Sequence, residues 1–117
     1  IIKALSRCSS QEAGEWNLVK TSAGILEGRV ASILVQAGAE VALVSRYRDG
    51  ETRLTSRAPR SMTSLGLHLG NIMSEIAEKL GGDGGGHDGA AGWSGKSDQI
   101  SAESAFIHAL ASIRRKK

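Results

Sequence analysis

Apolar and polar residues alternate along some segments of the chain and recur at helical spacing along others. The run at 16–23 alternates, which predicts a short strand. From Ile25 the apolar residues lie three or four positions apart, so we expect a helix with Ser22 as its N-cap and Gly38 just past its end. Residues 1–15 are polar and mixed, and their pattern predicts no element.

Asp49 and Gly50 separate two alternating runs, which is the strongest short-range pattern for a two-residue hairpin turn. We therefore expect strands at 40–48 and 51–58, the second ended by Pro59. Side chains alternate between the two faces of a strand. One face then carries four arginines: Arg46, Arg48, Arg53 and Arg57. The other is the expected core side, with Val41, Leu43, Tyr47 and Leu54.

Arg46 and Arg53 are direct neighbours across this predicted hairpin, where their like charges repel each other. An anion between them would relieve the repulsion, so the two arginines are a candidate accessory basic face. The alternative is a solvated face on which the arginines extend into water.

The second half of the chain repeats the helical pattern. A stripe over 65–80 predicts a second helix, ended by Gly81. Residues 90–95 are consistent with one more short strand, and a third helix is expected from about Ser101. The order of elements predicts an α/β fold. We expect a single small domain with a mixed sheet of about four to five strands, a hairpin at 40–58 and about three helices.

Residues 81–92 read GGDGGGHDGAAG, and three interpretations of this run differ in the context they require. Part of it, GGGHDG, matches the letters of a dinucleotide fingerprint, but that fingerprint follows a strand and this run follows a predicted helix. Residues 90–97, AAGWSGKS, resemble a P-loop but lack the buried strand that precedes one.

The third interpretation is an anion nest, in which successive glycines turn their N–H groups toward one point. The absence of Cβ atoms would let a phosphate touch the backbone of Gly84, Gly85 and Gly86. A histidine beside such a nest, here His87, can donate a hydrogen bond to a phosphate oxygen. The sequence therefore predicts a phosphate site at these four residues.

Composition narrows the class of protein. The chain has 117 residues and a net charge of +3, which suits one domain with an anionic partner. Aromatic residues are scarce, which argues against a platform that stacks single-stranded bases. The single cysteine, Cys8, excludes an internal disulfide and favours a reducing, cytoplasmic location. No apolar run is long enough to cross a membrane. The chain starts at Ile1, and we expect it to be part of a longer protein.

The string GGGHDGAAG at 84–92 resembles the Gly-Gly-Gly-His…Ala-Ala-Gly signature of the DHH-associated domain. That domain is the C-terminal, substrate-binding part of DHH-family phosphoesterases, which include RecJ-like exonucleases, nano-RNases and cyclic-dinucleotide phosphodiesterases. The family also carries Ser-x-Arg-Ser at the end of a strand upstream, where this chain has TSRA at 55–58. The resemblance covers about residues 16–113, and we place the domain at 16–117.

By this resemblance, the loop glycines and His87 would hold a nucleotide phosphate, and Arg57 would assist. The chain would be the substrate-binding domain of a metal-dependent phosphodiesterase or single-strand nuclease, a hydrolase. Its partners would be single-stranded nucleic acid or a short oligonucleotide, and the DHH catalytic domain of the same protein. Manganese or magnesium is implied only for that missing domain. The chain itself would hold no metal and no catalytic residue, and alone it would hydrolyse nothing.

Two further functions stay open. The chain could be an RNA-binding module akin to the C-terminal domain of alanyl-tRNA synthetase, although that domain has a longer glycine run without this His…Ala-Ala-Gly ending. It could also be a structural domain or a homodimer, because Gly66 and Gly70 would allow close helix packing.

Overall fold

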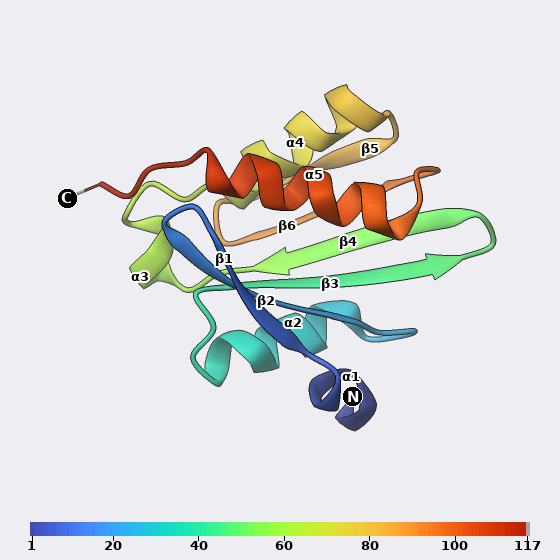
Figure 1. Cartoon of the computed structure of the whole chain (residues 1–117), viewed down its shortest axis with the longest axis horizontal. Coiled ribbons are helices and arrows are strands. Elements are labelled where there is room, and N and C mark those ends of the chain that lie inside the picture. Colours follow the sequence, from blue (N-terminus) through green and yellow to red (C-terminus); the bar gives the residue numbers. More distant parts are fainter. Residues whose placement is uncertain (117) are drawn as a thin grey trace.

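The chain forms a mixed six-stranded sheet with helices on both faces (Figure 1). The structure is a computed structural model, and it describes residues 1–116. The helices are α1 (Ile2–Ser6), α2 (Glu27–Gln36), α3 (Arg60–Thr63), α4 (Leu69–Leu80) and α5 (Gln99–Ala111). The strands are β1 (Ser9–Ala13), β2 (Trp16–Ser22), β3 (Val41–Arg48), β4 (Glu51–Arg57), β5 (Asp83–Gly86) and β6 (Ala90–Gly95).

The strands lie in the order β1-β2-β3-β4-β6-β5. Only β2 and β3 are parallel, and α2 connects them; every other neighbouring pair is antiparallel. The predicted α/β class, the mixed sheet and the hairpin at 40–58 are confirmed. The sheet has six strands, more than expected, because residues 9–13 and 83–86 each add a strand at one of its edges.

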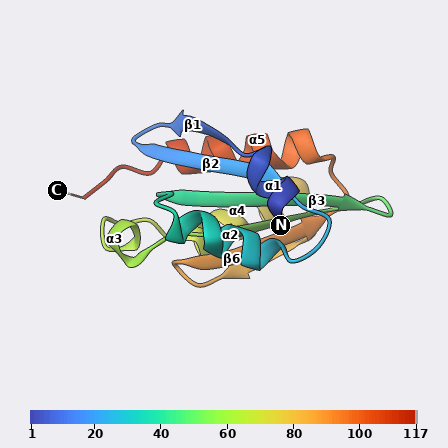
Figure 2. The same cartoon turned by 90° about the horizontal axis from the view of Figure 1, so that it is seen from below.

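Two hydrophobic cores lie on opposite faces of the sheet. The larger lies under α4 and α5 and contains three aromatic side chains, Trp16, Trp93 and Phe106, all at most 2% exposed. Burying aromatic rings of this size is the largest single contribution to such a core. The smaller core joins α1 and α2 to the opposite face at Ala42 and Val44. Figure 2 shows α5 and α2 on opposite sides of β3.

The β3–β4 hairpin has the expected turn and register. Asp49 and Gly50 have φ of 52° and 78°, the left-handed conformations that a tight hairpin turn requires. Arg46 pairs with Arg53 across the two strands, as predicted. Tyr47, which was expected on the core side, is 55% exposed. The reason is visible in Figure 1, where the tip of the hairpin extends beyond the helices.

Both early helices begin later than the sequence pattern predicts. Ser22 is not the N-cap of α2, because it is still paired with Ser45 in the β2–β3 ladder. The N-cap is Leu26, whose φ is 58° and which provides no side-chain cap. The helix expected over 65–80 starts only at Leu69, as α4, because Gly66 with φ of 105° lies in a loop; the short helix α3, which was not predicted, precedes that loop.

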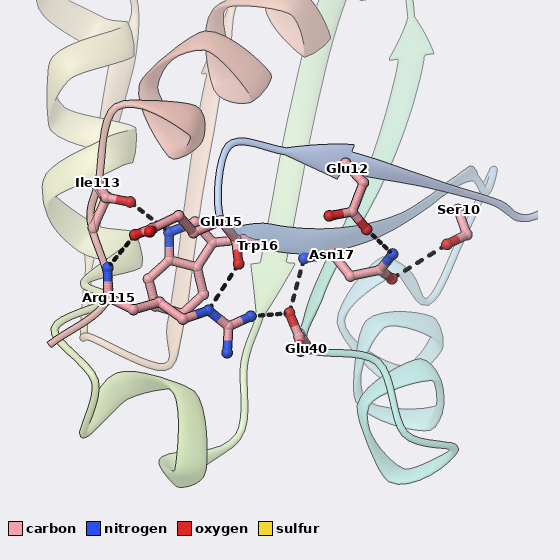
Figure 3. A network of polar contacts seen from close by, with 8 residues as sticks. All are labelled: Ser10, Glu12, Glu15, Trp16, Asn17, Glu40, Ile113 and Arg115. Carbon is pink, nitrogen blue, oxygen red and sulfur yellow. Dashed lines mark hydrogen bonds and ion pairs between the residues drawn. The ribbon is translucent and has the colours of Figure 1, made fainter. Parts of the chain in front are cut away.

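The C-terminal segment is fixed to the β1–β2 turn by Arg115 (Figure 3). The backbone N–H of Arg115 donates to the Glu15 carboxylate at 2.7 Å, and its guanidinium donates to the Glu15 carbonyl and to the Glu40 carboxylate. The same guanidinium lies 4.6 Å from the ring centre of Trp16, a cation–π arrangement. The Trp16 indole N–H donates to the Ile113 carbonyl at 2.8 Å. The chain end therefore contributes to the core.

Candidate functional site

Arg57 is the last residue of β4, and its backbone pairs with Ala42 on one side and Ala90 on the other. Its guanidinium extends over the first turn of α2, where Nη2 lies 3.0 Å from the position that a Cβ on Gly28 would occupy. Nη1 donates to the Ser56 carbonyl at 3.0 Å. The side chain is half-buried. Gly28 thus leaves the space that a guanidinium needs at this end of the sheet.

His87 lies in the tight turn between β5 and β6, next to the end of β4. Its N–H donates to the Ala90 carbonyl at 2.8 Å, which closes the turn, and the Ala58 N–H donates to the Gly89 carbonyl at 3.0 Å. His87 is exposed. Because Arg57 pairs with Ala90, the fold brings the turn of His87 and the end of Arg57's strand to the same corner of the sheet.

The start of α4 also belongs to this corner. The first N–H groups of the helix, those of Leu69 and Gly70, donate to the carbonyls of Asp88 and His87 at 2.8 and 2.9 Å. The next N–H, of Asn71, donates to Nδ1 of His68 at 3.0 Å. A helix N-terminus usually offers such groups to an anion. Here they are already used, and they hold the backbone of His87 in place instead.

The glycine run differs from its predicted conformation. Gly84, Gly85 and Gly86 belong to strand β5, where they pair with residues 91–93 of β6. Successive N–H groups of a strand point in opposite directions, so these three do not converge as a nest would require. The expected glycine loop is instead an edge strand. It packs directly against α4, and its backbone pairs with β6.

The glycines are required for that close packing. A Cβ on Gly84 would overlap the Met73 carbonyl oxygen of α4, and one on Gly70 would overlap the Gly86 carbonyl. The Gly70 contact is within this chain, so the small residue that suggested a dimer interface is used in the chain's own fold. Of the three glycines in β5, Gly85 alone has space, with Ser74 Oγ as the nearest atom at 3.8 Å. The run therefore serves the contact between helix and strand.

The predicted basic face already has an anion in the structure. The carboxylate Oε1 of Glu27, at the start of α2, lies 3.4 Å from Arg46 Nε and 3.8 Å from Arg53 Nη1. The Glu27 residue is 8% exposed. The repulsion expected between the two arginines is thus relieved by a carboxylate of the same chain. Arg57 is the arginine of this face that lies beside the turn of His87.

Sequence reasoning missed several residues of this corner. Glu27 and Gly28 were counted within a helix, and only the β2–α2–β3 connection brings that helix over the arginines. His68 falls within the helix expected over 65–80, and in the structure it is the N-cap of α4. The only sequence signal for this N-cap was a histidine just before an apolar stripe at helical spacing. Within residues 1–116, no group of three or more His, Cys, Asp or Glu side chains is arranged to hold a metal ion.

The comparisons with known proteins match almost the whole chain. The family model of the DHHA1 domain matches residues 17–115. An uncharacterised protein of Methanocaldococcus jannaschii is 31% identical over 118 residues, a match that covers 99% of this chain and 36% of that protein. The chain therefore spans about a third of the length of this curated relative.

Three solved structures share the fold. The C-Ala domain of Aquifex aeolicus alanyl-tRNA synthetase aligns with a TM-score of 0.73 at 16% identity, over 89% of this chain and 99% of that one. A DHH-domain protein described as a member of a family of ribosomal proteins aligns at 0.71 and 20% identity, over 97% of this chain and 30% of that one. The pGpG-specific phosphodiesterase of Vibrio cholerae aligns at 0.59 and 16% identity, over 91% and 36%.

Proposed function

The chain belongs to the DHHA1 domain family, and on that basis we propose that it is the substrate-binding domain of a metal-dependent DHH phosphodiesterase or single-strand nuclease. In this proposal the domain binds a phosphate of a single-stranded nucleic acid or short oligonucleotide. A DHH catalytic domain of the same protein, with manganese or magnesium, would activate the attacking water. The exposed free thiol of Cys8 is compatible with a cytoplasmic location, which is part of the proposal.

The observation that carries the proposal is the corner at which Arg57 and the turn of His87 meet. Arg57 provides a permanent cation at the end of β4, over the glycine that opens the first turn of α2. His87 is exposed on a turn whose backbone is fixed by four hydrogen bonds, to Ala58, Leu69, Gly70 and Ala90. A guanidinium and an imidazole held at one corner suit a phosphate group, because both donate charge-assisted hydrogen bonds to its oxygens.

The geometry changes the part that the glycines play. Gly84, Gly85 and Gly86 support the site by letting β5 and its turn pack against α4. The proposed phosphate contacts are therefore the side chains of Arg57 and His87, with the backbone of the turn beside them. The domain positions the substrate, and positioning alone supplies a large part of the rate when the reacting groups lie on another domain.

The test is to titrate the 117-residue chain with 5′-AMP and with a 5′-phosphorylated dinucleotide. Arg57→Ala and His87→Ala should each weaken binding about tenfold or more, because a charge-assisted hydrogen bond contributes about 1.5–3 kcal/mol. Arg114→Ala and His108→Ala are matched controls at exposed positions and should bind as the parent does. Added salt should weaken binding. Equal affinity of all four variants would refute the site.

A second function is favoured by one observation. The C-Ala domain of alanyl-tRNA synthetase aligns over 99% of its own length, so the whole of that domain shares the fold of this chain. A domain of this fold could therefore act as an RNA-binding module without a DHH catalytic domain. Competition between a transfer RNA and a dinucleotide discriminates the two functions. Preference for the transfer RNA would favour the RNA-binding module. Hydrolysis of the dinucleotide by this chain with Mn²⁺ would contradict the proposal that catalysis belongs to another domain.

A further inference from the structure

Beside the corner of Arg57 and His87, the sheet presents an open face over three strands. The helices α4 and α5 pack on the other face, against Ala91 and Trp93 of β6. On the open face α2 packs over β3 and β4, and no helix of residues 1–116 packs over β6 and β5. A hollow of about 230 Å³ lies there. Its lining includes Arg53, Thr55, Asp83, Gly92 and Ser94.

The register of the strands arranges this face in three cross-strand rows. Arg57 pairs with Ala90 in the first row, beside the turn of His87. Thr55, Gly92 and Gly85 form the second row, and Arg53, Ser94 and Asp83 form the third. Rows that are two residues apart on a strand are separated by about 7 Å. The third row is therefore about 14 Å along the strands from the backbone of Arg57, which leaves the middle row free between the two.

In the middle row, Gly92 leaves a half-buried stretch of backbone beside Thr55 that carries no side chain. Gly92 lies between Ala91 and Trp93, whose side chains are in the large core, so a side chain at 92 would point to the open face. Gly85 is its partner on β5. Gly92, which lines the hollow, leaves the peptide planes of the sheet uncovered there, and a flat ring or a ribose can lie directly on such a surface.

The third row places a cation, a hydroxyl and a carboxylate side by side. Arg53 is a donor at one rim; its side chain is 47% exposed, and Glu27 contacts it from the α2 side. Asp83, exposed at the start of β5, is an acceptor at the other rim, with Ser94 between them. A nucleobase edge presents donors and acceptors next to each other, and such a mixed row can satisfy both kinds.

We propose that this hollow is a nucleoside subsite. The nucleoside whose phosphate binds at Arg57 and His87 lies over Gly92, with its base edge on the row of Arg53, Ser94 and Asp83. This proposal rests on the proposed phosphate site, because the first row fixes the phosphate end. It assigns to the domain a contact with the base and sugar in addition to the phosphate.

The experiment compares ribose 5-phosphate with 5′-AMP and 5′-GMP, titrated into the 15N-labelled chain and followed by NMR. At least one nucleotide should bind about tenfold more tightly than ribose 5-phosphate, the factor expected from one or two hydrogen bonds between its base edge and the third row. The amide signal of Ser94, on the row assigned to the base edge, should shift with the nucleotides and not with ribose 5-phosphate.

Two variants test which residues provide the added affinity for nucleotides. Gly92→Val places a branched side chain in the middle row, and Asp83→Ala removes the acceptor at the rim. Asp83→Ala should lower nucleotide affinity to that of ribose 5-phosphate and leave the affinity for ribose 5-phosphate unchanged. Gly92→Val also covers the place of the sugar and should weaken the binding of both ligands. Glu78→Ala removes an exposed carboxylate from α4, on the other face, and should change neither affinity. Asp83→Ala keeps the test valid if Gly92→Val does not fold.

The outcomes separate the two proposals. If ribose 5-phosphate binds and depends on Arg57 and His87, but the nucleotides bind no more tightly, the subsite is wrong and the phosphate site stands. The subsite is also wrong if the nucleotides gain affinity that Asp83→Ala and Gly92→Val leave intact. If neither the sugar phosphate nor the nucleotides bind, both proposals are wrong.

Discussion

Arg46 and Arg53 face each other across the β3–β4 ladder, with the Glu27 carboxylate of α2 in contact with both. Glu27 thus supplies, from within the chain, the negative charge that two adjacent arginines require. These contacts also explain why α2 lies over this part of the sheet. The ion pairs hold its first turn, and the rest of the helix packs on the small core at Ala42 and Val44. With the first turn of α2 held in this way, Gly28 lies beneath the Arg57 guanidinium.

Replacement of Glu27 by glutamine should destabilise the fold, because two arginines would then face each other without a counter-charge. We expect the free energy of unfolding to fall by about 1–3 kcal/mol, the range for losing a charged partner at a buried position. Urea denaturation measures it. Glu51→Gln, at the exposed hairpin end, is the matched control and should change stability by less than about 0.5 kcal/mol. A Glu27→Gln protein as stable as the parent would show that the ion pairs are dispensable.

Gly84 and Gly85 should respond in opposite ways to the same substitution. Gly84→Ala places a methyl group against the Met73 carbonyl of α4, and we expect a loss of about 1–3 kcal/mol from the forced separation of helix and strand. Gly85→Ala meets no atom closer than 3.8 Å. It should be neutral or stabilising by up to about 1 kcal/mol, because alanine restricts the unfolded chain. Thermal unfolding of the two variants tests the pair, and equal losses would contradict the close-packing explanation.

Asp98 should make stability depend on pH at the start of α5. Hydrogen bonds from the side chain and backbone N–H of Ser101 lower the pKa of this carboxyl below its ordinary value. A carboxyl with a lower pKa in the folded state stabilises the fold above its unfolded pKa, and loses that contribution as the pH falls through the folded pKa. Asp98→Ala should therefore lower the melting temperature at neutral pH.

The difference in melting temperature between parent and Asp98→Ala should shrink as the pH falls, and vanish once Asp98 is protonated in the folded parent. Asp98→Asn is the control, because asparagine is also a favourable N-cap and carries no charge to titrate. A difference between parent and alanine variant that stays constant down to low pH would contradict the titration of Asp98.

Arg115 should contribute to stability although it lies near the chain end. Arg115→Ala removes the contacts of the guanidinium with Glu40, with the Glu15 carbonyl and with the Trp16 ring. We expect a loss of about 1–3 kcal/mol, from charge-assisted hydrogen bonds and a partly buried cation–π contact. Arg114→Ala removes the same charge from the preceding, exposed residue and should cost less than about 0.5 kcal/mol. The two chemical denaturation midpoints check this, and similar values would exclude a specific role for Arg115.

The sequence by itself determined the elements whose signals are local. The Asp49-Gly50 turn specified the hairpin and its register down to the pairing of Arg46 with Arg53, because turn geometry fixes which residues face each other. The helical stripes identified α2, α4 and α5, and the strand at 90–95 was predicted with its bounds. The signature around His87 identified the family, because a motif can be recognised from the residues alone, without knowledge of any tertiary contact.

Tertiary contacts decided the rest. Nothing local makes Asp83–Gly86 a strand, and glycine opposes it; the run pairs with β6 because only a backbone without Cβ atoms fits against α4. The start of α2 moved to Glu27 because Ser22 is held in the ladder with Ser45. Glu27, the partner of the two arginines, lies on another element, 19 residues before Arg46 and 26 before Arg53. No local pattern along the chain predicts such a contact, because it depends on where β2 ends and α2 begins.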